Sequence, residues 1–165
     1  MNIFFTNSDP AKAAQDQPDK LVVKMPVESV QMLVSALVRH NIPHNVMTKS
    51  GTLHRGGYAN HPCTIWAGDT RENFRWLLTH GYALCEEYQL RYGREHACKA
   101  QLDAIEKYSI LIPHGDLTTP ALAMPDELKT ADPVESYQNC IRNKVSMKPL
   151  SFVWNKYPEH KPAWA

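Results

Sequence analysis

Apolar residues recur at three- and four-residue steps over much of this chain, and this spacing predicts a mainly helical protein. The clearest repeat runs from Phe74 to Tyr92, and Gly93 ends it. Asp69 and Glu72 stand three residues apart before the repeat, so Asp69 is the expected N-cap of this long helix. Four other helices are expected, after the N-cap Asp9, from about Pro18 to His40, from Glu95 to Tyr108, and from Pro133, after the N-cap Asp132, to about Lys144.

Three segments lack this helical spacing. The short apolar run from Asn2 to Thr6 suits a strand or a buried N-terminal arm. Residues 41–60 are expected to form a loop, and the Pro- and Trp-rich residues 148–165 a tail that wraps the surface. The predicted fold is therefore mainly α: a compact single-domain helical bundle over residues 1–165, with a short extended N-terminal arm and an irregular C-terminal tail.

The helix expected near residues 18–40 is apolar around most of its circumference, as buried helices are. At about 100° per residue, five of its polar side chains share one sector roughly 80° wide. This polar stripe consists of Lys20, Lys24, Glu28, Gln31 and Ser35. Charged groups on a mostly buried helix are costly unless they pair with each other or line a wet cavity.

Two interpretations of the stripe stay open. Lys24 and Glu28 are four residues apart, a spacing that suits a half-exposed ion pair. Alternatively the stripe lines a cleft, where a lysine acts as nucleophile or anion ligand and the carboxylate as general acid or base. Pro26 removes one backbone hydrogen bond and is expected to allow a kink between the two charges.

Composition narrows the picture. The net charge of +1 over 165 residues argues against a strongly basic surface, so any nucleic-acid contact must come from a local patch. No uninterrupted apolar run approaches a membrane span, and the first residues lack a basic leader and a small-residue cleavage site, so a soluble cytoplasmic protein is expected. The four cysteines form no C-x-x-C pair, so reduced, buried thiols are expected, with no metal and no cofactor.

Further polar residues lie around the long helix. His61 precedes Pro62 in a restricted segment, and Trp76 lies in the first turns of the helix, where it could stack on a base. A structural histidine, a core tryptophan and a solvated charge run are the alternatives for these positions. The candidates for phosphate or nucleic-acid contacts here are Arg71, Asn73, Arg91 and Arg94.

A set of short motifs along nearly the whole chain resembles a widespread family of small tailed-phage proteins, which implies a phage origin more than a reaction. The motifs include Met1-Asn2-Ile3-Phe4, Asp19-Lys20-x-Val22-Val23-Lys24-Met25, Glu28, Gln31-Met32-Leu33, Asn60-His61-Pro62, Trp66, Asn73-x-x-Trp76-Leu77, Leu84-Cys85-Glu86-Glu87-Tyr88 and Arg91-Tyr92-Gly93.

More distantly, the layout is similar to the phage pyrimidine-dimer DNA glycosylases of the endonuclease V type. That resemblance implies a compact helical fold, an attacking N-terminal amine and one essential glutamate. Asp19 and Glu28 fall where that family has its early Asp and its catalytic Glu, and Pro162-Ala163-Trp164 is similar to its aromatic tail.

The sequence departs from that family in three ways. The glycosylases expose a processed residue, whereas Asn2 is too large for ordinary methionine removal, so Met1 is expected to remain at the terminus. Its amine, Lys24 and water are the candidate nucleophiles. The near-neutral charge is unexpected for a protein that scans duplex DNA. Arginine-rich contacts beside the glutamate are missing, and Lys20 and Lys24 are the nearest substitutes.

The leading hypothesis is a phage-encoded enzyme that acts on an N-glycosidic bond in DNA or in a nucleotide. The expected catalytic residues are Glu28, Met1 and His61, with Lys20 and Lys24 holding phosphate. Supporting roles are expected for Asp19, Gln31, Trp66 and Trp76.

Two other hypotheses stay open. The first is a non-enzymatic phage protein that binds a nucleotide signal or a host defence protein through the same lysines. The second is a transferase that modifies viral DNA bases. DNA or a nucleotide is the expected partner, a membrane is not, and the oligomeric state is left open.

Overall fold

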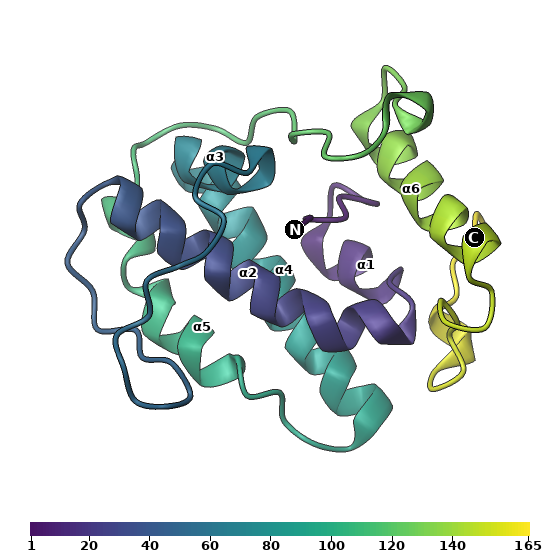
Figure 1. Cartoon of the computed structure of the whole chain (residues 1–165), viewed down its shortest axis with the longest axis horizontal. Coiled ribbons are helices and arrows are strands. Elements are labelled where there is room, and N and C mark those ends of the chain that lie inside the picture. The colour runs from purple at the N-terminus through teal and green to yellow at the C-terminus, as the bar shows by residue number, and fades with distance from the viewer.

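The computed structural model describes residues 1–165 and is mainly helical, as the spacing predicts (Figure 1). It contains no β-strand, only an isolated antiparallel bridge between Met47 and Leu53. Three short 3₁₀ turns complete the secondary structure. The α-helices are α1 (Pro10–Gln15), α2 (Asp19–Arg39), α3 (Pro62–Asp69), α4 (Arg71–Tyr92), α5 (Lys99–Glu106) and α6 (Pro133–Met147).

The core forms around α2 and α4, which cross each other at the centre of the bundle (Figure 1). α1 packs on α4, α3 lies against both central helices, and α6 stands on the far side of the N-terminal arm. A Cβ atom at Gly81 of α4 would lie 3.1 Å from Leu102 of α5 and 3.4 Å from Ser29 of α2. The missing side chain therefore lets α4 approach both neighbours closely.

α2 is the buried helix that its composition indicates. By length and hydropathy alone α2 could cross a membrane, but 72% of its most apolar 18-residue stretch is buried inside the fold. Pro26 is itself buried, and the helix runs unbroken across it. The polar stripe therefore stays on one continuous face.

Several helix ends lie where the sequence predicts them. The Asp9 carboxylate accepts hydrogen bonds from the first turn of α1, and Asp132 does the same for α6. Gly93 adopts φ 69° and ends α4 in the left-handed conformation that glycine favours. α6 continues to Met147, slightly beyond its predicted end.

The predicted N-cap of α4 is wrong by one residue. Thr70 caps the helix, because its hydroxyl accepts the hydrogen bond from the Asn73 backbone nitrogen at 3.1 Å. Asp69 instead ends the short helix α3, and its carboxylate forms an ion pair with Arg39 of α2 at 2.8 Å. Helix α3 was not expected, because eight residues are too few to show an amphipathic repeat.

Helix α5 is shorter than predicted. It begins at Lys99, not at Glu95, because His96 is held against α2. The His96 ring donates from Nε2 to the Val23 carbonyl at 3.1 Å and accepts at Nδ1 from the Cys98 backbone nitrogen at 3.1 Å. These contacts fix a turn ahead of the helix.

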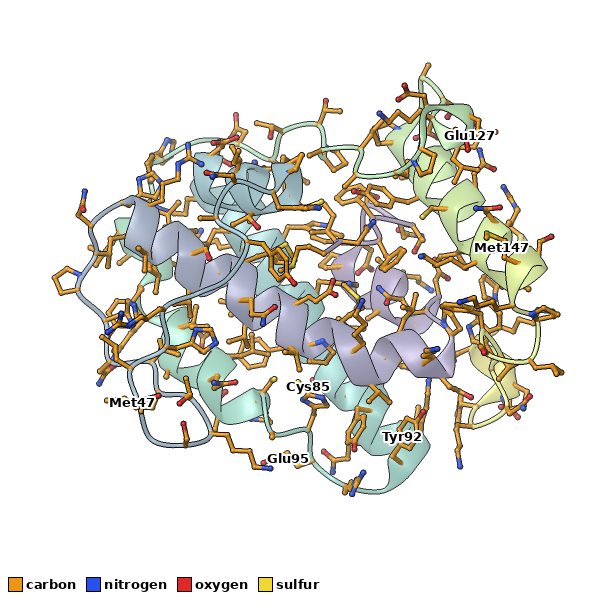
Figure 2. All side chains as sticks on the ribbon, viewed as in Figure 1. Met47, Cys85, Tyr92, Glu95, Glu127 and Met147 are labelled. Atoms are coloured by element: carbon orange, nitrogen blue, oxygen red, sulfur yellow. The ribbon has the colours of Figure 1, made fainter.

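All four cysteines are free and buried, as expected; Figure 2 labels Cys85 beneath α2. Burial raises the pKa of Cys85 to about 12 and that of Cys63 and Cys98 to about 11. These thiols therefore stay protonated near neutral pH and act as apolar core side chains.

The C-terminal tail packs back on the start of α2. The Asp19 backbone nitrogen donates to the Val153 carbonyl at 2.8 Å, and its carboxylate accepts from the Lys156 backbone nitrogen at 3.0 Å. The indole of Trp154 is buried and donates to the Asp16 carbonyl at 3.1 Å. The tail is therefore part of the packed structure on that side of the bundle.

His80 links α4 to α1 in the core and makes stability depend on pH. Its Nδ1–H donates to the Pro10 carbonyl at 2.9 Å, so Nε2 accepts from the Gln17 amide at 3.1 Å. Burial lowers the pKa of His80 from 6.5 to about 4. The folded protein therefore favours the neutral ring, while the unfolded chain takes up a proton at higher pH.

We expect the free energy of unfolding to fall as pH drops from about 6.5 to about 4, with His80 contributing up to about 3 kcal/mol of the loss. Urea unfolding at a series of pH values measures the slope. His80→Gln keeps a polar side chain but cannot take up the proton, so its slope is expected to be shallower. An unchanged slope in this variant would contradict the assignment.

Candidate active site

The N-terminal arm carries the first residue into the middle of the molecule (Figure 1). Ile3, Phe4 and Phe5 are buried and anchor the arm in the core. Phe4 adopts φ 42°, a backbone conformation that bulky residues disfavour. The Asn2 side chain braces this bend, because its Oδ1 accepts from the Phe4 backbone nitrogen at 2.9 Å. The bend directs Met1 and Asn2 towards α2.

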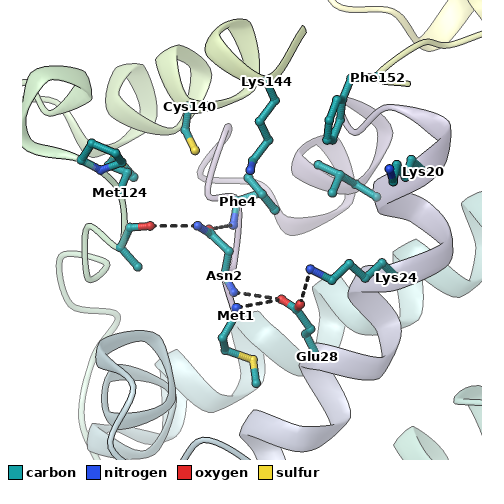
Figure 3. A pocket seen from close by; sticks show the side chains of 13 residues that line it. Met1, Asn2, Phe4, Lys20, Lys24, Glu28, Met124, Cys140, Lys144 and Phe152 are labelled. Carbon is teal, nitrogen blue, oxygen red and sulfur yellow. Dashed lines mark hydrogen bonds and ion pairs between the residues drawn. The ribbon is translucent and has the colours of Figure 1, made fainter. Parts of the chain in front are cut away.

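Glu28 of α2 receives the start of the chain (Figure 3). Its side chain is only 9% exposed, and its Oε2 lies 3.8 Å from the Met1 amine and 3.0 Å from the Asn2 backbone nitrogen, which donates to it. Its Oε1 pairs with Lys24 Nζ at 2.8 Å, and Lys24 reaches solvent. Glu28 therefore forms the ion pair with Lys24 and also faces the start of the chain, so the two interpretations of the stripe are compatible.

Two cavities meet at these residues. The first has a volume of about 310 Å³ and lies between the N-terminal arm, α2, α6 and the tail. The second has a volume of about 370 Å³ and extends towards residue 58 of the long loop. They share three lining residues, which are Met1, Lys24 and Glu28.

The first cavity is electropositive at its mouth. Lys20 Nζ lies 5.5 Å from the ring centroid of Phe152, and Lys144 Nζ lies 5.8 Å from the same ring and 5.7 Å from that of Phe4 (Figure 3). Neither lysine has a carboxylate within ion-pair distance, and Glu28 is the only acidic side chain that lines the cavity. Three lysines and one carboxylate, which already pairs with Lys24, thus line this cavity.

His61 lies at the N-terminus of α3, close enough to the Met1 amine and to Glu28 for their charges to affect its pKa. Its Nδ1 accepts from the Cys63 backbone nitrogen at 3.2 Å and so caps the helix. Burial lowers the pKa of His61, the positive Met1 amine lowers it further, and the negative Glu28 opposes them. The ring is therefore neutral at neutral pH and is held as a helix cap.

The remaining polar residues of α2 have different surroundings. Gln31 lines the second cavity. Asp19 lines neither cavity, because its carboxylate binds Arg91 and the tail. Ser35 holds the loop through Gly57, accepting from its nitrogen at 2.8 Å and donating to its carbonyl at 3.0 Å.

The candidates for nucleic-acid contacts in α4 and just after it do not line either cavity. Arg91 is fully buried, and Asn73 is buried with its amide bound to Trp66 and Thr118. Arg71 donates to the Ile110 carbonyl at 2.7 Å, and Arg94 donates to the Tyr88 hydroxyl at 2.8 Å. We therefore leave these residues out of the proposed substrate contacts.

Trp66 and Trp76 lie in the core. Their ring centroids are 6.0 Å apart in an edge-to-face arrangement, and Phe5 stacks on Trp76 at 4.4 Å. Each indole nitrogen donates to a backbone carbonyl, that of Thr118 and that of Ser8 respectively. They support the arm that carries Met1 and offer no face to a base.

The cavity-lining residues that sequence reasoning missed include Asn2, Tyr58, Lys144 and Phe152. Of these residues, only Asn2 could have been found from the sequence, because it is next to Met1. The other three come from a loop, the last turns of α6 and the tail, where no local spacing marks a site. In addition, no group of His, Cys, Asp and Glu side chains is arranged to hold a metal ion.

Fold and site together define a helical protein that holds an α-amine against a buried glutamate beside an electropositive cavity, an arrangement suited to covalent attack on an electrophilic carbon. The family model for pyrimidine dimer DNA glycosylase matches residues 1–100, and the chain belongs to this family. No curated protein and no solved structure matches it significantly. The matched region supplies Met1, Lys20, Lys24 and Glu28, whereas Lys144 and Phe152 lie outside it.

Proposed function

We propose that this protein is a DNA glycosylase that attacks a deoxyribose carbon with the amine of its first residue, assisted by Glu28. The observation that carries the proposal is the 3.8 Å separation between the Met1 amine and the Oε2 atom of a buried glutamate, at the junction of two cavities. Groups that act on one reacting centre need this proximity. Family membership supports DNA as the substrate.

The chemistry follows from these groups. The free-base amine attacks C1′ of the sugar, an N–C1′ bond forms, and the glycosidic bond breaks with its electron pair leaving on the base. Glu28 stabilises the developing positive charge at the sugar and accepts a proton from the attacking nitrogen. The sugar ring then opens: the C1′–O4′ bond breaks, O4′ takes up the proton held by Glu28, and the nitrogen forms a protonated imine with C1′. Water hydrolyses this imine, which frees the amine and leaves an abasic sugar.

Lys24 and the other two lysines have separate tasks in this proposal. Lys24 binds Glu28 Oε1, which leaves Oε2 directed at the amine. Lys20 and Lys144 have no acidic partner, so they are available to bind phosphates that flank the attacked sugar. This local cluster provides the positive patch that the near-neutral net charge makes necessary.

Borohydride trapping on an oligonucleotide with one abasic site tests the proposal. We expect one covalent adduct per chain, and peptide mass mapping is expected to place it on the N-terminal α-amine. Protein acetylated at that amine is the control and is expected to form no adduct. Without Met1, Asn2 would carry the α-amine, and its nitrogen also lies close to Glu28, at 3.0 Å from Oε2. The mass of the mapped peptide shows which of the two residues is the first.

An adduct on a lysine such as Lys24, or no adduct at all, would contradict the proposed nucleophile. Acetylation of the α-amine separates these outcomes, because a lysine adduct would persist in the acetylated protein.

A further inference from the structure

The positive charge of the chain is concentrated at its C-terminal end. Residues 136–165 contain five lysines and arginines and one acidic residue, Glu159, whereas residues 1–135 contain thirteen and sixteen. The lysines that form ion pairs are Lys24, Lys99 and Lys129, all of them before this segment. α6 and the tail therefore carry unpaired cations, and these suit a polyanionic partner such as DNA.

The turn between α6 and the tail carries the two most exposed large apolar side chains of the protein. Leu150 is 94% exposed, and Met147 in the last turn of α6 is 70% exposed (Figure 2). A single exposed leucine is common on a protein surface. Here, however, the two apolar residues alternate along the chain with Lys144 and Lys148. The turn thus presents an apolar tip among cations.

Hydrogen bonds hold the turn in one conformation. The Lys148 backbone nitrogen donates to the Lys144 carbonyl at 3.0 Å. The Lys148 carbonyl accepts from the backbone nitrogens of Ser151 at 2.9 Å and Phe152 at 3.2 Å. Pro149 follows Lys148, and its ring fixes φ at the position of a tight turn where proline is favoured. Leu150 is therefore presented from a closed, stiff turn.

The turn lies beside the first cavity. Lys144 and Phe152 line that cavity on the side opposite Glu28 (Figure 3). The same two residues also line a smaller hollow of about 190 Å³, together with Met147 and Lys148. The exposed end of α6 is therefore continuous with the wall of the cavity in which the sugar is proposed to react.

We propose that Leu150 is a wedge that enters the base stack of duplex DNA beside the attacked nucleotide, while Lys144 and Lys148 bind the neighbouring phosphates. This inference rests on the proposed function, because it takes the partner to be the DNA whose sugar the amine attacks. Apolar side chains that enter a base step unstack it and bend the duplex. The wedge therefore opens the duplex locally next to the cavity.

The size of the apolar tip favours DNA over a protein partner. A stable protein interface buries at least about 1,200 Å², which one leucine and one methionine do not supply. A wedge needs only a single side chain, because contacts with phosphates provide most of the affinity. Lys144 and Lys148 provide such contacts on the same turn.

Leu150→Ser tests the wedge, because a side chain that is 94% exposed adds little to the packed core. The first probe is a duplex with a stable abasic analogue and the fluorescent base 2-aminopurine next to it, which brightens when unstacked. We expect the wild-type protein to raise this fluorescence and Leu150→Ser to lose most of the rise. Borohydride trapping on abasic duplex and abasic single strand is the second measurement. The ratio of the duplex rate to the single-strand rate is expected to fall about tenfold in Leu150→Ser.

Three further variants serve as controls. Leu150→Met keeps an apolar side chain and is expected to keep both the fluorescence rise and the rate ratio. Leu111→Ser removes another exposed leucine, 57% exposed in the 3₁₀ turn Ser109–Leu111, and is expected to behave as the wild type. Lys148→Ala is expected to weaken duplex binding and to reduce its salt dependence by about one ion, while saturating protein still unstacks the base.

An unchanged fluorescence rise and an unchanged rate ratio in Leu150→Ser would overturn the wedge. A Leu150-dependent binding to vesicles of phosphatidylcholine and phosphatidylglycerol, with no effect on duplex DNA, would also overturn it and assign the turn to a lipid surface. The proposed function fails separately. If the wild-type protein unstacks the base through Leu150 but forms no adduct on either DNA, the amine chemistry is rejected and the wedge stands. An adduct without Leu150-dependent unstacking rejects the wedge alone.

Discussion

Glu28→Gln is expected to lower the rate of adduct formation with abasic DNA by about 10²- to 10⁴-fold. Glutamine has nearly the same shape and can still accept the hydrogen bond from the Asn2 nitrogen. It cannot take the proton from the attacking amine, and it carries no charge to stabilise the sugar cation. Single-turnover borohydride trapping at several pH values measures the rate directly.

Glu72→Gln provides the matched control for this variant. Glu72 is also helical and also paired with a neighbouring basic side chain, Arg75 at 2.9 Å, but that pair is on the surface. We expect Glu72→Gln to form the adduct at the wild-type rate. Full activity in Glu28→Gln would mean that the amine acts without the carboxylate, and the mechanism proposed here would have to be abandoned.

Arg91→Met is expected to lower the free energy of unfolding by about 3–5 kcal/mol. The Arg91 side chain is fully buried and forms ion pairs with Glu87 at 2.8 Å and Asp19 at 3.2 Å. It also donates to the carbonyls of Gln15 and Gln17. Methionine fills part of the space but leaves two carboxylates without their cation in a buried site. Urea unfolding at neutral pH measures the loss.

Arg75→Met tests whether burial, and not the charge itself, sets this cost. Arg75 and Glu72 form a pair of the same type that is about half exposed on both sides. Exposed pairs of this kind contribute at most about 1 kcal/mol, so this variant is expected to unfold almost as the wild type does. If Arg91→Met were equally mild, the buried network would not stabilise the fold as inferred.

The sequence predicts site residues best where they lie on one helix with a regular spacing of polar and apolar positions. Lys20, Lys24 and Glu28 follow from the period of a single apolar helix, and the structure brings all three to one cavity. The helical fold and most helix ends are predictable for the same reason, because local spacing and capping residues determine them. Met1 entered through the resemblance, and the structure places its amine near Glu28.

The remaining site residues depend on contacts between distant segments. Tyr58 and Lys144 line the cavities because the loop and α6 fold back on α2, and neither segment has a local pattern that predicts this. Arg91 shows the converse: a charged residue near the end of a helix suggests a solvated face, but here it fills a buried network. Polar residues in the core are predictable only together with their partners.

The two walls of the first cavity come from opposite ends of the chain, from residues 1–28 and from residues 123–152. Contacts between segments so far apart in sequence carry a large loop-closure entropy and tend to form late in folding. A nascent or partly folded chain therefore has the Met1 amine and Glu28 without the wall that carries Lys144. Under the proposed mechanism, such a chain lacks one of the phosphate-binding lysines, so its full reactivity towards DNA is expected only once folding is complete.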